Sequence, residues 1–155
     1  MTFAIREAGP QDAALITYHR RRMFEDMGRD AVAIEDMERR FLPWVEDQLV
    51  RGSYLGWFAT SGEEVVAGAG LWVMDWLPHI LGRSTLRGNI VNVYTEAAYR
   101  RQGLARRLTQ LCIDWCWAND IDLIILHASD EGRPLYESMG FELLPERLSI
   151  LELAL

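Results

Sequence analysis

The chain has 155 residues, of which half are hydrophobic and a quarter are charged, a balance typical of one globular domain and not of a disordered segment. Its 23 acidic and 16 basic residues, the latter all arginine, give a net charge of −7, which argues against a dedicated nucleic-acid-binding protein. The apolar stretch Val65–Met74 is far shorter than the ~20 residues of a membrane-spanning helix. The N-terminus has no basic segment followed by an apolar run, so we expect no secretory signal and a cytoplasmic protein.

The two cysteines, Cys112 and Cys116, are four residues apart, which places them on one face of a helix. No second cysteine pair and no nearby histidine accompanies them. We therefore interpret them as small core residues in a reducing compartment, and not as a metal or redox pair. No metal site is expected.

The first half of the chain predicts five elements. They are a strand at Phe3–Glu7, a helix opened by Pro10 and capped by Asp12 that ends at Gly28, a helix at Ile34–Val50, and two strands, Tyr54–Thr60 and Val65–Met74, that form a hairpin around 61–64. Pro43 lies inside the second helix. Because proline removes a backbone donor and clashes with the preceding turn, we expect a kink there or two short helices.

The second half predicts the remaining elements. They are a strand at Asn89–Thr95, a helix from Leu104 to about Ala118, a strand at Asp122–His127, a short helix at Gly132–Met139 ended by Gly140, and two last strands, Phe141–Leu144 and Leu148–Leu153. The apolar run in Asp122–His127 predicts a central strand buried on both faces. The order of elements predicts one mixed α/β domain, residues 1–155, around a twisted sheet.

The segment from Val93 to Arg107 ends a strand, turns, and begins a helix at Gly103. The first N–H groups of a helix have no internal partner and carry the positive end of the helix dipole, so this turn predicts an anion site. Four arginines surround it: Arg100, Arg101, Arg106 and Arg107. Guanidinium groups match phosphate oxygens, whereas cations at an unoccupied helix N-terminus oppose the dipole. We interpret the segment as a phosphate site, and not as a solvated basic turn.

The same segment carries the pattern Arg100-x-x-Gly103-x-Ala105. About thirty residues later the chain carries Leu-Tyr-Glu-x-x-Gly-Phe, residues 135–141. With the strand before and the amphipathic helix after the first pattern, these two landmarks resemble those of the GCN5-related N-acetyltransferase (GNAT) superfamily, over essentially the whole chain. The resemblance implies the acyl-CoA N-acyltransferase fold, which is a single mixed α/β sheet splayed at its centre and flanked by helices. It also implies acetyl-CoA as cofactor and acetyl transfer to an amine.

The resemblance also assigns the cofactor contacts. The strand Asn92–Thr95 would pair its free backbone groups with the amides of the pantetheine arm, and the pyrophosphate would sit on the N–H groups of 102–106. Ser129 stands where the family often has an asparagine that helps to hold the cofactor. The predicted cofactor-binding residues are Asn92, Val93, Tyr94, Thr95, Arg100, Arg101, Gln102, Gly103, Leu104, Ala105, Arg106 and Ser129.

Tyr136 is the predicted catalytic acid, because the tyrosine of this family motif lies beside the cofactor sulfur and can protonate the leaving thiolate. The family's glutamate base would fall near Asn89, which cannot act as a base. His127 is the candidate base, since an imidazole titrates near neutral pH; a histidine merely hydrogen-bonded at a strand end is the alternative. Glu96 and Asp75 are further candidates for the base.

The acceptor would bind near Trp72, Asp75 and His79, where two tryptophans, a carboxylate and an imidazole leave a strand. An aromatic wall with one carboxylate suits a cationic amine; a surface loop packed by its own aromatics is the alternative. Trp44 and Trp57 are predicted to be core residues.

The sequence therefore predicts an acetyl-CoA-dependent N-acetyltransferase in which a primary amine attacks the thioester directly. The alternatives are a non-catalytic acyl-CoA-binding or sensor domain and a transferase of a longer acyl group. The predicted partner is a small-molecule amine or a peptide or protein amine, with no nucleic acid and no membrane. Dimers are common in the family, and the apolar end Ile150–Leu155 is a candidate surface for a homodimer.

Overall fold

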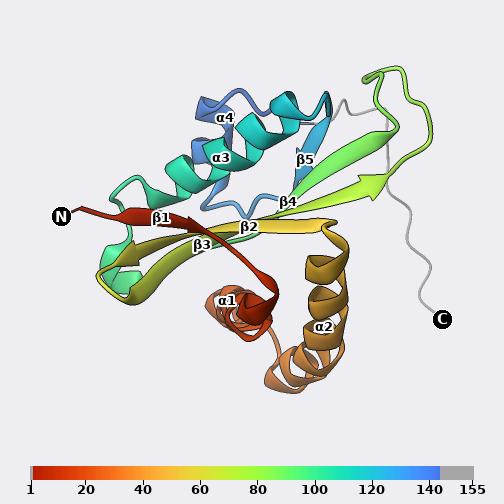
Figure 1. Ribbon diagram of the computed structural model, residues 1–155. Coiled ribbons are helices and arrows are strands. Elements are labelled where there is room, and N and C mark those ends of the chain that lie inside the picture. Colours follow the sequence, from red (N-terminus) through yellow and green to blue (C-terminus); the bar gives the residue numbers. More distant parts are fainter. Residues whose placement is uncertain (1, 144–155) are drawn as a thin grey trace.

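The computed structural model describes residues 2–143, which form a five-stranded sheet between two layers of helices (Figure 1). The strands are β1 (Ala4–Glu7), β2 (Tyr54–Ser61), β3 (Glu64–Asp75), β4 (Leu86–Thr95) and β5 (Ile124–Leu126), and they lie in that order across the sheet. The first three junctions are antiparallel, and β4 pairs with β5 in parallel. The predicted mixed sheet is therefore confirmed. No helix within these residues is long and apolar enough to cross a membrane.

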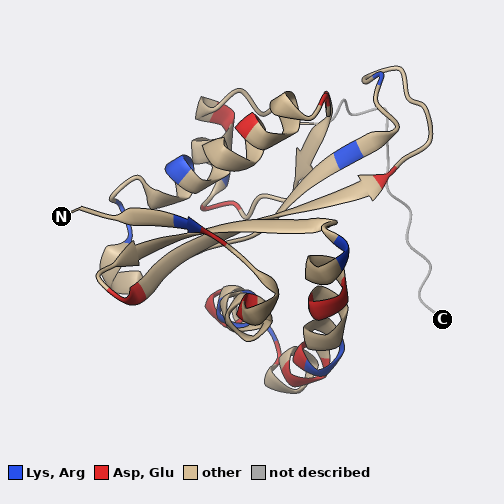
Figure 2. Ribbon diagram, in the orientation of Figure 1, with Lys and Arg blue, Asp and Glu red and all other residues tan. Residues whose placement is uncertain are grey.

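Helices α1 (Ala13–Asp26) and α2 (Ala31–Arg51) cover one face of the sheet. A short 3₁₀ turn, Pro10–Asp12, leads into α1, and the carboxylate of Asp12 accepts hydrogen bonds from Gly9 N–H and from Arg6. Charged residues are frequent on these two helices and sparse along β2 and β3 (Figure 2).

Helix α2 runs through Pro43 without a break, so the predicted division into two short helices is wrong. Pro43 lies on the exposed side of the helix, where water can donate a hydrogen bond to the carbonyl that proline, which has no N–H, leaves unpaired. The opposite side buries Ile34, Val45 and Leu49. That packing holds the helix together across the proline.

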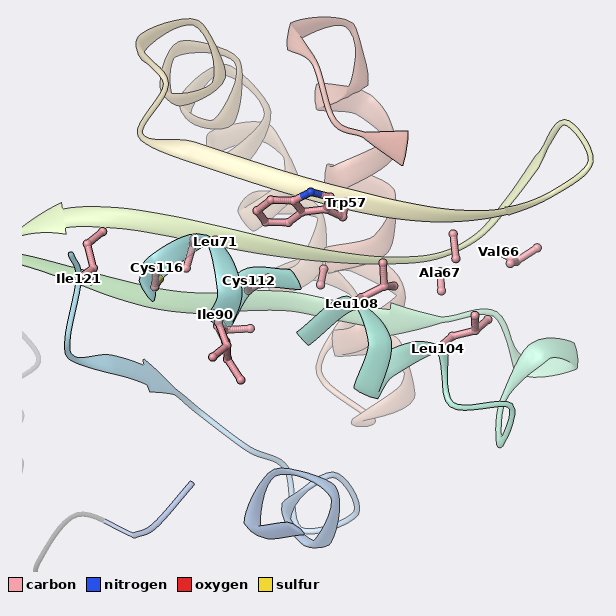
Figure 3. Close-up of a cluster of buried hydrophobic side chains, with 13 residues drawn as sticks. Trp57, Val66, Ala67, Leu71, Ile90, Leu104, Leu108, Cys112, Cys116 and Ile121 are labelled. Atoms are coloured by element: carbon pink, nitrogen blue, oxygen red, sulfur yellow. The ribbon is translucent and has the colours of Figure 1, made fainter. Parts of the chain in front are cut away.

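Helix α3 (Leu104–Ala118) packs on the other face, with α4 (Arg133–Ser138) beside it in Figure 1. Figure 3 shows how the α3 side chains Leu104, Leu108, Cys112 and Cys116 point to the sheet, where they are almost fully buried. Both cysteines are fully buried core residues, and this burial raises the pKa of the Cys112 thiol and raises that of Cys116 to about 11. Trp57 is buried in the same cluster, as predicted.

Strands β4 and β5 pair over only three positions, from Gly88 opposite Ile124 to Ile90 opposite Leu126. The predicted strand Asp122–His127 is thus shorter than expected, and its three residues are half-buried, so the prediction of burial on both faces is wrong. The helices of the two layers pack mainly over β2, β3 and β4, while Ile124 and Leu126 of β5 pack at the edge of the cluster formed with α3. Of the predicted last strands, Phe141–Leu143 is not in a strand, while Leu148–Leu153 and the proposed dimer surface lie outside the described residues.

Candidate active site

A cleft of about 1390 Å³ opens where β4 and β5 diverge. Beyond Ile90, the edge of β4 that faces β5 has no strand partner among residues 2–143. Those backbone N–H and C=O groups of Val91–Thr95 that point away from β3 are thereby left on the cleft side, where an extended ligand can pair with them as another strand would. The predicted central splay is therefore present.

A β-bulge at Asn92 shapes this edge. Gly68 pairs with Tyr94 and Gly70 with Val91, so two residues of β4 lie opposite one residue of β3. Asn92 has a φ of 54°, a left-handed conformation that asparagine tolerates better than most residues. Its buried side chain donates a hydrogen bond to the Tyr54 hydroxyl at 2.8 Å and accepts one from Arg20 at 2.9 Å.

The N-terminus of α3 lines the cleft next to the C-terminal end of β4. Gly103 precedes the helix with a φ of 77°, and no side chain caps the first turn. Apart from its two chain neighbours, no atom of residues 2–143 lies within 4 Å of the position that a Cβ of Gly103 would occupy. The cleft lining continues through Leu104, Ala105 and Arg106. The exposed helix end can therefore receive an anion.

The predicted arginines differ in what they contact. Arg100 donates to the Thr95 carbonyl at 2.9 Å and forms an ion pair with Asp26 at 2.6 Å, so it holds the loop before α3 against the end of α1. Arg101 and Arg106 line the cleft, and Arg106 also donates to Ser138. Arg107 does not line the cleft but donates to the carbonyl of Phe3. Three of the four predicted arginines thus line the cleft near the start of α3.

Tyr136 of α4 lines the cleft together with His127 and Ser129, which follow β5. The Tyr136 ring is half-buried and packs edge-on against Phe141, with centroids 6.1 Å apart. Burial, with a smaller contribution from the Cys112 thiol, raises the pKa of the Tyr136 hydroxyl above its usual value. The hydroxyl group therefore remains protonated at neutral pH. Ser129 Oγ accepts a hydrogen bond from Gly132 N–H at 3.1 Å and so begins the turn that carries Tyr136.

The opposite side of the cleft is lined by what we call the aromatic wall: Phe24, Phe41, Trp44, Tyr54 and Trp72. Trp44 is its centre, with ring centroids 5.3 Å from Trp72, 5.6 Å from Phe41 and 6.4 Å from Tyr54. Trp44 is half-buried and packs against the core cluster that contains Val45 and Leu49, as predicted, but it also lines the cleft, which was not predicted. Trp44 lies on the side of α2 that faces the sheet, but at the point where the sheet surface opens into the cleft.

Comparison with known proteins places this cleft in a family. The family model for acetyltransferases of the GNAT type matches residues 17–141. The chain belongs to the GNAT acetyltransferase family. A GCN5-related N-acetyltransferase from Ralstonia eutropha JMP134 superposes with a TM-score of 0.90 at 32% identity, over 97% of this chain and 99% of that one. A predicted acetyltransferase from Clostridium acetobutylicum, solved with acetyl-CoA, gives 0.88 at 25% identity, over 97% and 96%.

A more distant GNAT structure shares the fold alone. Glucosamine-6-phosphate N-acetyltransferase from Arabidopsis thaliana has a TM-score of 0.67 at 18% identity, over 97% of this chain and 99% of that one. A comparison with curated proteins gives no match. The predicted GNAT fold and family are thereby confirmed.

In this GNAT domain, some of the predicted site residues line the cleft and others do not. All the predicted cofactor-binding positions line it except Gln102, which is exposed in the turn before α3. Trp72 lines it, but Asp75 is exposed at the end of β3, and His79 lies in the following loop, where its Nδ1 accepts from Leu81 N–H at 3.1 Å. Glu96 does not line the cleft, and its carboxylate accepts from the hydroxyl groups of Tyr18 and Tyr94.

Two cleft residues with unpaired polar atoms were not predicted as site residues. Asn89 pairs with Trp72 across β3 and β4, which places both on the face of the aromatic wall. Its Oδ1 is buried and has no partner among residues 2–143. Arg20, from α1, lines the same side, and its Nε is likewise buried and unpaired in that part of the chain. No local sequence pattern marks Arg20, because it reaches the cleft only when α1 packs on the sheet. Asn89 stands near the position of the family's glutamate base, where an amide cannot act as a base.

Proposed function

We propose that the chain is an acetyl-CoA-dependent N-acetyltransferase that moves an acetyl group to a primary amine. The observation that carries the proposal is the free edge of β4 beside the uncapped N-terminus of α3, in one cleft. Acetyl-CoA has both a chain of amide groups and a pyrophosphate. The β4 backbone at Val93 and Thr95 would pair with the amides, and the N–H groups at the start of α3 would bind the phosphates.

The residues around the cleft supply the remaining steps. A backbone N–H of the β4 edge would stabilise the negative charge that develops on the thioester oxygen as the amine attacks. The Tyr136 hydroxyl, which is protonated at neutral pH, would donate its proton to the departing thiolate. His127, exposed at the end of β5, is the cleft-lining candidate for removing the proton of the amine. Cys112 and Cys116 are buried under the sheet, so we expect direct transfer and no acyl-cysteine.

The test combines a binding and a turnover measurement on the full chain. Calorimetry with acetyl-CoA measures affinity, and release of the free thiol measures transfer to a panel of small amines. We expect binding, and thiol release that depends on the amine. Binding without release for any amine would leave an acyl-CoA-binding domain, and absence of binding would reject the cofactor assignment.

A further inference from the structure

Arg20 is a half-buried cation on the aromatic wall. Its guanidinium carbon lies 5.0 Å from the ring centroid of Phe24 on its own helix and 5.0 Å from that of Phe41 on α2. The terminal nitrogen Nη1 donates to Asn92 Oδ1 at 2.9 Å. Asn92 is itself fixed by the β-bulge and by Tyr54. The charge is therefore held in one place beside the cleft by contacts from three elements.

Arg20 has no counter-ion among residues 2–143. The neighbouring arginines of α1 form ion pairs, Arg21 with Glu25 and Glu38, and Arg22 with Glu25. Asp26, the acidic residue of α1 that lines the cleft, is paired with Arg100. The other contacts of Arg20 are with a neutral amide and two aromatic rings, none of which cancels its charge.

An unpaired, partly desolvated cation is unfavourable unless something compensates it. Burial lowers the pKa of Arg20 from its usual value because it disfavours the charged form, although a guanidinium still remains charged at neutral pH. The Nε–H is buried without a partner in the described chain. An anion bound at the terminal nitrogens of Arg20 would supply the missing charge.

We infer that the acceptor is an amine that also carries an anionic group, a carboxylate or a phosphate, and that Arg20 binds this group against the aromatic wall. The inference rests on the proposed acetyltransferase function and names its acceptor class. It replaces the expectation that Asp75 binds a cationic amine, because Asp75 does not line the cleft. Phe24 and Phe41 fix the guanidinium in advance, so binding an anion costs little side-chain entropy.

The test uses matched acceptors that differ in the anionic group. One set pairs amino acids with their carboxamides, and a second pairs phosphoethanolamine with ethanolamine; the two sets separate a carboxylate from a phosphate. We expect at least one set to favour the anionic member by tenfold or more in kcat/KM. In Arg20→Met, which keeps a flexible apolar side chain between the two rings, this preference should disappear through a higher KM, while the affinity for acetyl-CoA stays the same. Arg20→Lys should retain part of it, because the charge remains but the planar fork is lost.

Arg21→Met is the matched control, since Arg21 is the next residue on α1 and does not line the cleft; it should keep the wild-type preference. Equal turnover of both members of every pair, or a preference that survives in Arg20→Met, would overturn the inference while the acetyltransferase function stands. If acetyl-CoA binds but no amine is acetylated, calorimetric titration of the CoA complex with the same anionic amines decides. Binding to wild-type protein that weakens in Arg20→Met supports the anion site, and no binding overturns it.

Discussion

Gly103 meets two requirements at once, a left-handed backbone and an open approach to the first turn of α3. Valine satisfies neither, because its branched Cβ is strained at a φ of 77° and would project toward the predicted pyrophosphate. We predict that Gly103→Val weakens acetyl-CoA binding at least tenfold, which corresponds to about 1.4 kcal/mol. Calorimetry on the folded variant measures this directly.

Gly62→Val is the control for the strain alone. Gly62 also has a positive φ and open surroundings, but it lies in the β2–β3 turn away from the cleft. The Gly62→Val substitution should lower the thermal stability and leave the affinity for acetyl-CoA unchanged. Equal affinities for Gly103→Val and wild type would remove the cofactor assignment from this turn.

Tyr136→Phe removes a hydroxyl group and keeps the ring that packs against Phe141. An interaction used only in the transition state appears in kcat and not in binding. We predict a fall in kcat of roughly a hundredfold or more, the usual size of a general-acid contribution, with acetyl-CoA affinity nearly unchanged. Tyr99→Phe is the control. It also removes one tyrosine hydroxyl, but that hydroxyl donates to Glu64, so kcat should stay close to the wild-type value. Turnover of Tyr136→Phe within twofold of wild type would exclude the proposed role.

His127 governs the acidic side of the pH profile if it is the base. Only a neutral imidazole can accept the proton of the amine, so kcat/KM should fall as the pH is lowered, and His127→Ala should abolish this dependence. The check is to measure kcat/KM against pH for wild type and His127→Ala with two acceptors whose amines differ in basicity. A decline that follows the basicity of the acceptor and survives in His127→Ala would show that the amine loses its proton through water.

How well a site residue can be predicted depends on how locally its role is encoded. Gly103 and Tyr136 lie within short motifs whose backbone conformation is set by neighbouring residues, and both line the cleft. Asp75 ends β3, three residues after Trp72, but β3 and β4 extend past the cleft, so Asp75 lies outside it. Arg20 and Trp44 reach the cleft only through the packing of α1 and α2 on the sheet. No pattern within either helix encodes that packing.

At the scale of elements, α1 brings a buried histidine onto the sheet. His19 is 2% exposed, and its ring lies 5.8 Å from that of Phe58 and 5.2 Å from that of Tyr94. Burial lowers its pKa to about 4, although the nearby Glu96 acts in the opposite direction. In the unfolded chain a histidine titrates near ~6.5. Between these two values the unfolded state binds a proton that the folded state does not.

The free energy of unfolding should therefore fall as the pH drops from about 6.5 to about 4, by an amount of the order of 3 kcal/mol if the full shift is realised. Urea denaturation across this range measures it. In His19→Gln the dependence should be much weaker, because glutamine does not titrate. His79→Gln, at a loop histidine, should keep the wild-type slope. Parallel slopes for wild type and His19→Gln would show that other groups are responsible.

Element boundaries were predictable where one residue encodes them. The start of α3 after Gly103 and the end of α4 before Gly140 agree with the sequence, since both glycines have a positive φ that marks a helix end. The burial of β5 was not predictable in this way. An apolar run shows that a segment can be buried, but the layers that cover it are set by the tertiary fold.

For the whole molecule, the short β4–β5 pairing leaves residues 124–139 tied to the rest of the sheet by few backbone hydrogen bonds. Segments with few such contacts open readily, and a ligand that bridges them slows the opening. We predict that saturating acetyl-CoA slows amide hydrogen exchange in 124–139 and leaves the β2–β3 hairpin unchanged. Hydrogen-exchange mass spectrometry measures both regions. Gly103→Val at the same acetyl-CoA concentration is the control and should show little slowing. Uniform slowing throughout the chain would indicate global stabilisation and not a bridge.

The bulge at Asn92 reverses which face of the sheet the odd- and even-numbered side chains of β4 point to. Up to Val91 the side chains alternate in one phase, with Ile90 toward α3 and Val91 toward the aromatic wall; after the bulge Val93 faces α3 and Tyr94 faces α1. The consecutive residues Val91 and Asn92 therefore both face the aromatic wall, which two neighbouring residues of a regular strand cannot do. Removing one residue here would restore a regular ladder but transpose every later side chain of β4 to the opposite layer. The irregularity thus works as a phase shift that lets a single strand contribute backbone to the cleft and a polar side chain to its wall.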